Sequence, residues 1–251
     1  MSAGLIGSFH VADEPLGAGE LIARFGGHPL GALGVDLETS EGLGRWLVMA
    51  CLYGGRVDDA VAAEAVRGLV AAGLADPSRI AEASPEALES LLAAAEYPAP
   101  DVAARMLWRV SDSLAKRYSG CLDALASQSD QLEDLASHLA SLAPGFGAAR
   151  VARFLRPLRD RWPVACEVPL QPAARAAAQH LGLLREGEDE EGEPGALRAA
   201  LRSDPASPTL ADAEYALERL GARACRRNRT ARCPLGEDCP YTTLAPRRGK
   251  D

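Results

Sequence analysis

The chain has 251 residues, of which 47% are hydrophobic and 25% are charged, proportions that indicate a folded globular protein and exclude a wholly disordered one. It contains no apolar run of about 18 residues and opens without a basic and then apolar leader, so we expect a cytoplasmic protein with no membrane partner. Its net charge of −8 argues against a nucleic-acid-binding surface over the whole molecule, because phosphate binding needs clustered lysine and arginine.

Helices are predicted along the first half of the chain, where Ala, Leu, Glu and Arg are frequent. The predicted segments are a short helix at residues 16–25, a buried helix at 43–52, and an Ala-rich helix that begins at Asp58 or Asp59 and ends before Gly73. Asp76 and Ser84 each precede a proline. This order indicates two helix starts, because the polar side chain caps the first turn and proline needs no hydrogen-bond acceptor there.

Apolar residues recur at every third or fourth position in the second half, which is typical of amphipathic helices. The predicted segments are residues 102–114, 132–142, 151–158, a helix that starts at Pro172 and ends near Gly182, and a last helix at 210–220. The acidic stretch 185–195 is predicted to be an exposed linker, because it cannot bury enough apolar surface. No strand pattern occurs, so the predicted fold class is all-α.

Two of these helices meet at "PGFG", residues 144–147. Gly145 and Gly147 permit a close approach of the backbone to a ligand, and Phe146 between them can fill the gap between the helices. The helix that follows begins with N–H groups that can bind an anion such as phosphate. The alternative is an ordinary turn between two helices, and the motif alone favours that alternative.

Cysteine and arginine cluster in the tail. Cys225, Cys233 and Cys239 lie within fifteen positions, and such clusters in a cytosolic chain usually bind metal, because disulfides are rare there. Thiolates at this spacing suit zinc or an iron–sulfur cluster. From Arg219 onward the tail has nine basic and three acidic residues, so it carries a positive patch in an acidic protein.

Together these features resemble the helix-hairpin-helix DNA glycosylases of the endonuclease III type. The stretch "LASLAPGFGAARVA" is similar to the hairpin of that family, and "CPLGEDCP" is similar to the end of its iron–sulfur loop. The resemblance implies a two-lobed all-α fold. Residues 41–164 would form a six-helix barrel lobe with the helix-hairpin-helix at about 131–160. Residues 1–40 and 165–251 would form a second lobe that ends in the cysteine-rich loop 225–239.

The positions that carry the chemistry of this family differ here. The family's lysine, which attacks the sugar, corresponds to Ala149, and a methyl group cannot form a Schiff base. The family's aspartate, which activates water, corresponds to Gln171. Glu167 is the only nearby carboxylate that could replace it, and we interpret Glu167 as an exposed loop residue. The glutamine that often enters the base stack corresponds to Gly54 or Gly55.

The resemblance also implies an iron–sulfur cluster held by Cys225, Cys233 and Cys239. The second of the family's four cysteines is missing here, and the loop is two residues shorter, so a 4Fe–4S cluster would need a fourth ligand other than cysteine. The alternatives are zinc, with His180 or Cys166 as the additional ligand, and no metal.

We therefore expect an endonuclease III-like DNA-binding protein of the base-excision-repair glycosylase superfamily. It would be a nucleoid-associated monomer that binds DNA largely independently of sequence, with glycosylase and AP-lyase activity lost or strongly reduced. The expected DNA-binding residues are Gly145, Phe146, Gly147, Arg150, Arg153, Arg226, Arg227 and Arg229. The alternatives are an active glycosylase with relocated catalytic residues and a helical protein-interaction module that does not bind DNA.

Overall fold

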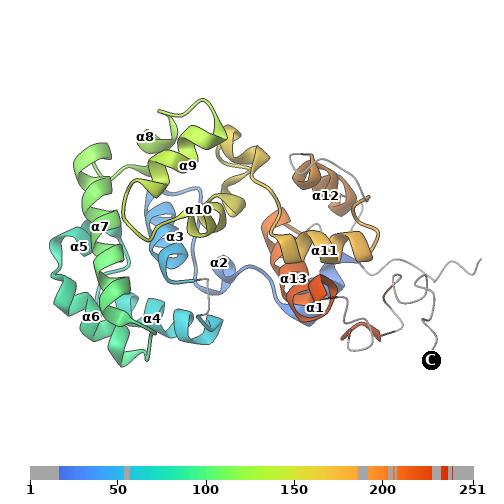
Figure 1. Ribbon diagram of the computed structural model, residues 1–251, viewed down its shortest axis with the longest axis horizontal. Coiled ribbons are helices and arrows are strands. Elements are labelled where there is room, and N and C mark those ends of the chain that lie inside the picture. Colours follow the sequence, from blue (N-terminus) through green and yellow to red (C-terminus); the bar gives the residue numbers. More distant parts are fainter. Residues whose placement is uncertain are drawn as a thin grey trace, which may run out of the picture. The chain divides into compact units, whose positions relative to one another are not determined.

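The computed structural model describes residues 17–53, 57–185, 192–202, 206, 208–227, 233–236 and 239. All regular elements in this part of the chain are helices, which confirms the predicted all-α class (Figure 1). None of these helices is both long enough and apolar enough to cross a bilayer.

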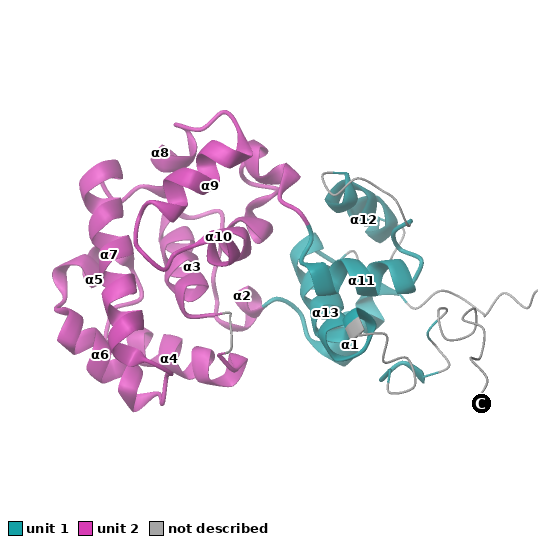
Figure 2. Cartoon of the chain, viewed as in Figure 1, with its two compact units in different colours: residues 1–28, 170–251 teal, residues 29–169 magenta. Residues whose placement is uncertain are grey.

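The chain divides into two compact units. The middle unit is continuous and comprises residues 29–169, whereas the end unit combines residues 1–28 and 170–251 (Figure 2). The boundaries expected from the sequence, after residues 40 and 164, lie nearer the middle of the chain. The observed boundaries follow the packing, because Leu30 and Val168 belong to the core of the middle unit and Leu170 belongs to the core of the end unit.

The helices of the middle unit follow one another with short connections. Their bounds are α2 (Pro29–Ala32), α3 (Ser40–Leu52), α4 (Asp59–Ala71), α5 (Pro77–Glu82), α6 (Pro85–Ala94), α7 (Pro100–Tyr118), α8 (Leu122–Ala126), α9 (Leu132–Ala140), α10 (Ala148–Leu155), and the 3-10 helices η1 (Arg156–Leu158) and η2 (Pro163–Glu167). The helices predicted at 43–52, 102–114, 132–142 and 151–158 correspond to α3, α7, α9 and α10.

Side-chain caps begin α3 to α6. Thr39, Asp58, Asp76 and Ser84 each accept a hydrogen bond from a backbone N–H group in the first turn of the helix that follows. These contacts confirm the helix starts predicted at Asp76 and Ser84, and they select Asp58 rather than Asp59 as the cap of α4.

Helix α3 lies within the core of the middle unit. Every residue over 43–52 except Arg45 is buried, so this helix is apolar on all sides. Trp46 Nε1 donates a hydrogen bond of 2.8 Å to the Phe154 carbonyl oxygen. This buried contact attaches α10, and with it the hairpin, to the central helix.

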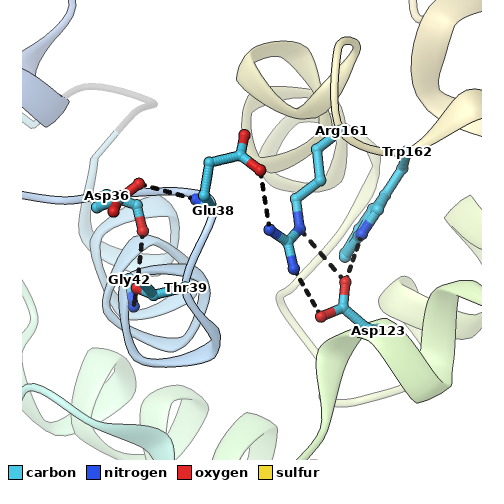
Figure 3. Close-up of polar contacts among 7 residues, drawn as sticks. All are labelled: Asp36, Glu38, Thr39, Gly42, Asp123, Arg161 and Trp162. Atoms are coloured by element: carbon cyan, nitrogen blue, oxygen red, sulfur yellow. Dashed lines mark hydrogen bonds and ion pairs between the residues drawn. The ribbon is translucent and has the colours of Figure 1, made fainter.

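A polar cluster joins three further segments of the middle unit (Figure 3). Arg161 Nη2 lies 2.7 Å from Asp123 Oδ2, and Arg161 Nη1 lies 3.5 Å from Glu38 Oε2. Trp162 Nε1 donates to Asp123 Oδ1 at 2.8 Å. Burial raises the pKa of Asp123, but hydrogen bonds from Arg161 and Trp162 and the Arg161 charge outweigh burial and lower this pKa below its usual value. The cluster ties α8 to the loop before α3 and to the segment after η1.

The end unit is built around a close crossing of two helices. Its elements are α1 (Ala18–Phe25), α11 (Pro172–His180), α12 (Glu193–Leu201), α13 (Leu210–Arg223) and the 3-10 helix η3 (Cys225–Arg227). A Cβ atom at Gly221 of α13 would lie 1.8 Å from the Ala173 carbonyl oxygen of α11. Only glycine therefore allows the two backbones to touch at this point.

The C-terminal end of the stretch 185–195, which we expected to be an exposed linker, is helical and partly buried. Helix α12 begins at Glu193, which is only 1% exposed. The Glu193 carboxylate pairs with Arg175 of α11, with 2.6 Å between Oε1 and Nε. This partner offsets the cost of burying the charge and is distant in sequence, so acidic composition alone predicted exposure incorrectly. Residues 186–191 lie outside the described residues.

Candidate nucleic-acid interface

The hairpin consists of α9, a turn over residues 141–147, and α10. Leu142, Ala143 and Phe146 are buried and hold the turn against the core of the middle unit. The Phe146 N–H group donates to the Ala143 carbonyl oxygen at 3.1 Å. Gly145 has a φ of +94°, a conformation that side-chain-bearing residues rarely adopt. The turn therefore needs glycine at this position, and Phe146 fills the gap between the helices.

Helix α10 begins with N–H groups that face no acceptor. Gly147 is the N-cap residue, and no side chain caps the helix. The N–H groups of Gly147, Ala148 and Ala149 have no hydrogen-bond acceptor in the described part of the chain, and all three residues are exposed. Such groups, together with the positive end of the helix dipole, attract anions. The hairpin thus has the chemistry to bind a phosphate.

A shallow hollow of about 350 Å³ lies over the turn. It is lined by Ala140, Ser141, Ala143, Pro144, Gly145, Phe146 and Gly147. Small side chains and backbone form most of its walls, and none of these lining residues is acidic. The hollow therefore has mostly apolar walls without a carboxylate, and it lies beside the open N–H groups at the start of α10.

Arg150, which was expected to contact DNA, binds backbone groups within the protein. Its Nη1 donates to the Gly145 carbonyl oxygen at 2.9 Å, and its Nε donates to the Cys51 carbonyl oxygen at 3.1 Å. Burial raises the pKa of nearby Tyr97, and the Arg150 charge opposes this rise. The Tyr97 hydroxyl donates to the Leu52 carbonyl oxygen at 2.6 Å. The guanidinium group thus joins the hairpin turn to the C-terminal end of α3.

Burial and the charge of Arg150 shift the pKa of the Cys51 thiol in opposite directions. Burial raises the pKa of Cys51 to about 12, although the nearby Arg150 charge lowers it. The thiol is therefore protonated at neutral pH, and Cys51 serves as a small core residue beneath the hairpin.

Arg117 reaches the hairpin from the C-terminal end of α7, and the sequence did not single it out. Its Nη1 lies 2.8 Å from Ser141 Oγ and 3.4 Å from the Ser141 carbonyl oxygen, and Ser141 lines the hollow. Its Nη2 donates to the Tyr118 hydroxyl at 3.1 Å, and its guanidinium carbon lies 5.2 Å from the centroid of the Tyr118 ring. A cationic side chain is thus held at the rim of the hollow.

The other expected DNA-binding arginines belong to both units. Arg153 lies half-buried on α10. Arg226 is exposed in η3, and the backbone of Arg227 belongs to the same element. Arg229 lies outside the described residues.

Ala149 and Gln171, which correspond to the catalytic lysine and aspartate of the resembling family, are placed as follows. Ala149 is exposed in the first turn of α10. Gln171 caps α11, because its side-chain oxygen accepts hydrogen bonds from the N–H groups of Ala173 and Ala174. Its own N–H group donates to Glu214 Oε1 at 2.8 Å. Glu167 is exposed at the end of η2, in agreement with our interpretation of it as an exposed residue.

The three tail cysteines belong to the end unit. Cys225 and Cys239 are buried and Cys233 is half-buried. Burial and the neighbouring Cys233 and Cys239 raise the pKa of Cys225 to about 12. Burial raises the pKa of Cys233, and the nearby backbone of Leu235 and Gly236 opposes this rise. The Gly236 N–H group donates to the Cys233 carbonyl oxygen at 3.0 Å.

A complete metal site is not formed by the side chains whose placement is described. No three His, Cys, Asp or Glu side chains among them are arranged to hold a metal ion. Cys166, a candidate fourth ligand, belongs to the middle unit. His180 is the last residue of α11 and lies about 10 Å along the helix axis from Ala173. Ala173 contacts Gly221, which is near the end of α13, two residues before the helix ends and four before Cys225.

No protein-family description matches this chain, and no curated protein gives a significant match to it.

Proposed function

We propose that this chain is a DNA-binding protein of the endonuclease III-like superfamily in which glycosylase and AP-lyase activity is lost or strongly reduced. The observation that carries the proposal is the hairpin between α9 and α10. Its turn depends on a left-handed Gly145, and its second helix begins with three exposed N–H groups that have no acceptor among the described residues. Phosphate contacts made through backbone N–H groups position DNA without reading its sequence.

Binding is expected to be weak, largely independent of sequence and strongly dependent on salt, because counterion release supplies most of its free energy. Gly147→Val tests the hairpin. Gly147 has an extended conformation, with φ −86° and ψ −176°, and no atom lies within 4 Å of an added Cβ. The variant should fold, but its branched side chain stands at the open N–H groups and should abolish much of the binding to a DNA duplex.

Gly68→Val in α4 is the matched control, because a Cβ there also meets no neighbour within 4 Å. Fluorescence anisotropy of labelled duplex and single-stranded DNA at low salt measures both variants against the wild type. If the wild type binds neither DNA, or if Gly147→Val binds as tightly as Gly68→Val, the proposal is wrong. A protein-interaction module would then be the better interpretation.

Loss of the lyase reaction has its own test. Ala149 carries no amine, so the protein should form no covalent adduct with abasic-site DNA when borohydride is added. A trapped adduct would contradict the proposed loss and favour the alternative of relocated catalytic residues, for which Glu167→Gln is the first variant to assay.

An iron–sulfur cluster on Cys225, Cys233 and Cys239 is part of the proposal. The three cysteines of the tail, two of them buried in the end unit, support it, and a fourth ligand other than cysteine would complete the cluster. Protein purified without air should be brown and contain equal amounts of iron and sulfide. Cys233→Ser should remove the colour and destabilise the tail, because metal binding and folding of such a loop are coupled. Colourless protein with stoichiometric zinc would replace the cluster with a zinc site.

A further inference from the structure

The hairpin lacks the exposed cation that the sequence assigned to Arg150. Two backbone carbonyl oxygens, from Gly145 and Cys51, accept hydrogen bonds from the Arg150 guanidinium. A guanidinium group with these partners holds the turn in its conformation. Arg150 is therefore a positioning residue for the hairpin, and its Nη1 and Nε donors are occupied by backbone acceptors instead of being free to bind a phosphate.

Arg117, in contrast to Arg150, keeps part of its guanidinium group open to a ligand. It is exposed, and its contacts with Ser141 and Tyr118 use two N–H groups on Nη1 and one on Nη2. Guanidinium has five N–H donors, so the Nε–H and one Nη2–H remain without an acceptor among the described residues. Ser141 Oγ donates to the His138 carbonyl oxygen at 2.7 Å, which fixes the hydroxyl that accepts from Arg117. The side chain is thus held in place while two donors stay open.

The charge of Arg117 is also unpaired within the described part of the chain. Two other cations of α7 each have an aspartate four residues earlier: Arg105 pairs with Asp101, and Lys116 pairs with Asp112. The residue four positions before Arg117 is Ser113, and no carboxylate among the described residues forms an ion pair with Arg117. A full positive charge therefore stands beside a hollow whose lining contains no acidic residue.

We propose that Arg117 binds a DNA phosphate at the rim of the hairpin hollow, in the role that the sequence suggests for Arg150. The inference rests on the proposed function, because it adds a side-chain contact to the backbone contacts of α10. A guanidinium group held by Ser141 and Tyr118 loses little conformational freedom when its two open donors meet phosphate oxygens, which favours arginine over lysine at this position.

The salt dependence of duplex binding tests this contact. One phosphate contact contributes about 0.9 to the slope of log K against the logarithm of salt concentration. Arg117→Ala should therefore make the slope shallower by about 0.9 and weaken binding about equally on unrelated sequences, while the thermal midpoint stays close to that of the wild type. Arg117→Lys should bind DNA less tightly than the wild type but show the wild-type slope. Lysine keeps the positive charge and loses only the planar guanidinium group that can donate two parallel hydrogen bonds to a phosphate.

Arg67→Ala is the charge-matched control, since Arg67 is an exposed cation of α4 that pairs with Glu64. It should leave both the affinity and the slope unchanged. Arg150→Ala should instead lower the thermal midpoint, because it removes the hydrogen bonds that join the Gly145 carbonyl oxygen of the turn to the Cys51 carbonyl oxygen of α3. The inference is overturned if Arg117→Ala keeps the wild-type slope, or if Arg117→Lys loses as much slope as Arg117→Ala.

The two proposals can fail separately. If Gly147→Val abolishes DNA binding and Arg117→Ala does not alter it, only the inference about Arg117 fails. A wild type that does not bind DNA overturns both proposals.

Discussion

Gln171 and Arg150 illustrate how the partners of a side chain decide its role. The resemblance places Gln171 where the family has a catalytic aspartate, and in this chain its oxygen caps α11. Arg150 follows the hairpin glycines, and its donors turn inward to Gly145 and Cys51. Both residues are polar and partly accessible, so their type alone is compatible with catalysis or DNA binding. Their hydrogen-bond partners give each of them a structural role.

The cap formed by Gln171 predicts a measurable effect on stability. Gln171→Ala should lower the free energy of unfolding by about 1 kcal/mol, because N–H groups in the first turn of α11 lose their acceptor. Gln171→Asp should be tolerated or slightly stabilising, since aspartate is a strong N-cap residue. Urea unfolding followed by circular dichroism measures both variants. Equal loss of stability in the two variants would argue against a capping role.

At the scale of helices, the crossing of α11 and α13 depends on a missing side chain. Gly221 brings α13 against the Ala173 carbonyl oxygen, and Ala174, Ala177 and Leu217 are buried in the same core. Small residues along the contact keep the backbones close, and the polar ends of α11 are satisfied by caps. The crossing is therefore a steric requirement of the end unit.

Gly221→Ala should destabilise the end unit strongly. The added Cβ would lie 1.8 Å from a backbone oxygen, which cannot move without separating the two helices. We expect a loss of about 1–3 kcal/mol, as is usual for overpacked cores. Gly195→Ala is the control, because nothing lies within 4 Å of a Cβ there. Similar unfolding midpoints for the two variants would show that α11 and α13 do not cross as described.

The polar cluster of Asp123, Arg161 and Trp162 predicts a dependence of stability on pH. Because the pKa of Asp123 is lowered in the folded protein, its carboxylate contributes stability at any pH above the ordinary aspartate pKa. That contribution is lost as the pH falls through the lowered pKa. Asp123→Asn should therefore reduce the thermal midpoint at neutral pH, and the difference from the wild type should shrink in acid. A difference that is constant with pH would exclude a role for the charge.

At the scale of the whole molecule, the two units differ in how the chain builds them. The middle unit is one continuous segment with its own hydrophobic core, whereas the end unit needs both chain ends to complete its core (Figure 2). Phe25 and Leu21 of α1 pack in the same cluster as Leu217 and Leu220 of α13. Folding of the end unit therefore requires contacts between residues far apart in sequence.

This difference predicts the behaviour of fragments. A fragment of residues 29–169 should fold by itself, with a cooperative urea transition and dispersed amide resonances, because its core is complete. A fragment of residues 170–251 lacks α1 and should unfold at lower urea concentration or remain unfolded. If the second fragment proved as stable as the first, α1 would not belong to the core of the end unit.

Most of the helices and their order could be predicted from local sequence patterns. Caps such as Asp76 and Ser84, the prolines after them and the apolar periodicity of α7, α9 and α10 act within one or two turns, so they can be recognised without a fold. The burial of Glu193 against Arg175 and the direction of the Arg150 side chain depend on packing between distant segments, so no local pattern predicted them. Arg150 is 99 residues from its acceptor at Cys51, and no local pattern encodes a hydrogen bond of that range. The same reason explains why the exposed cation beside the hairpin is Arg117, because its place depends on how α7 packs beside the turn that contains Ser141.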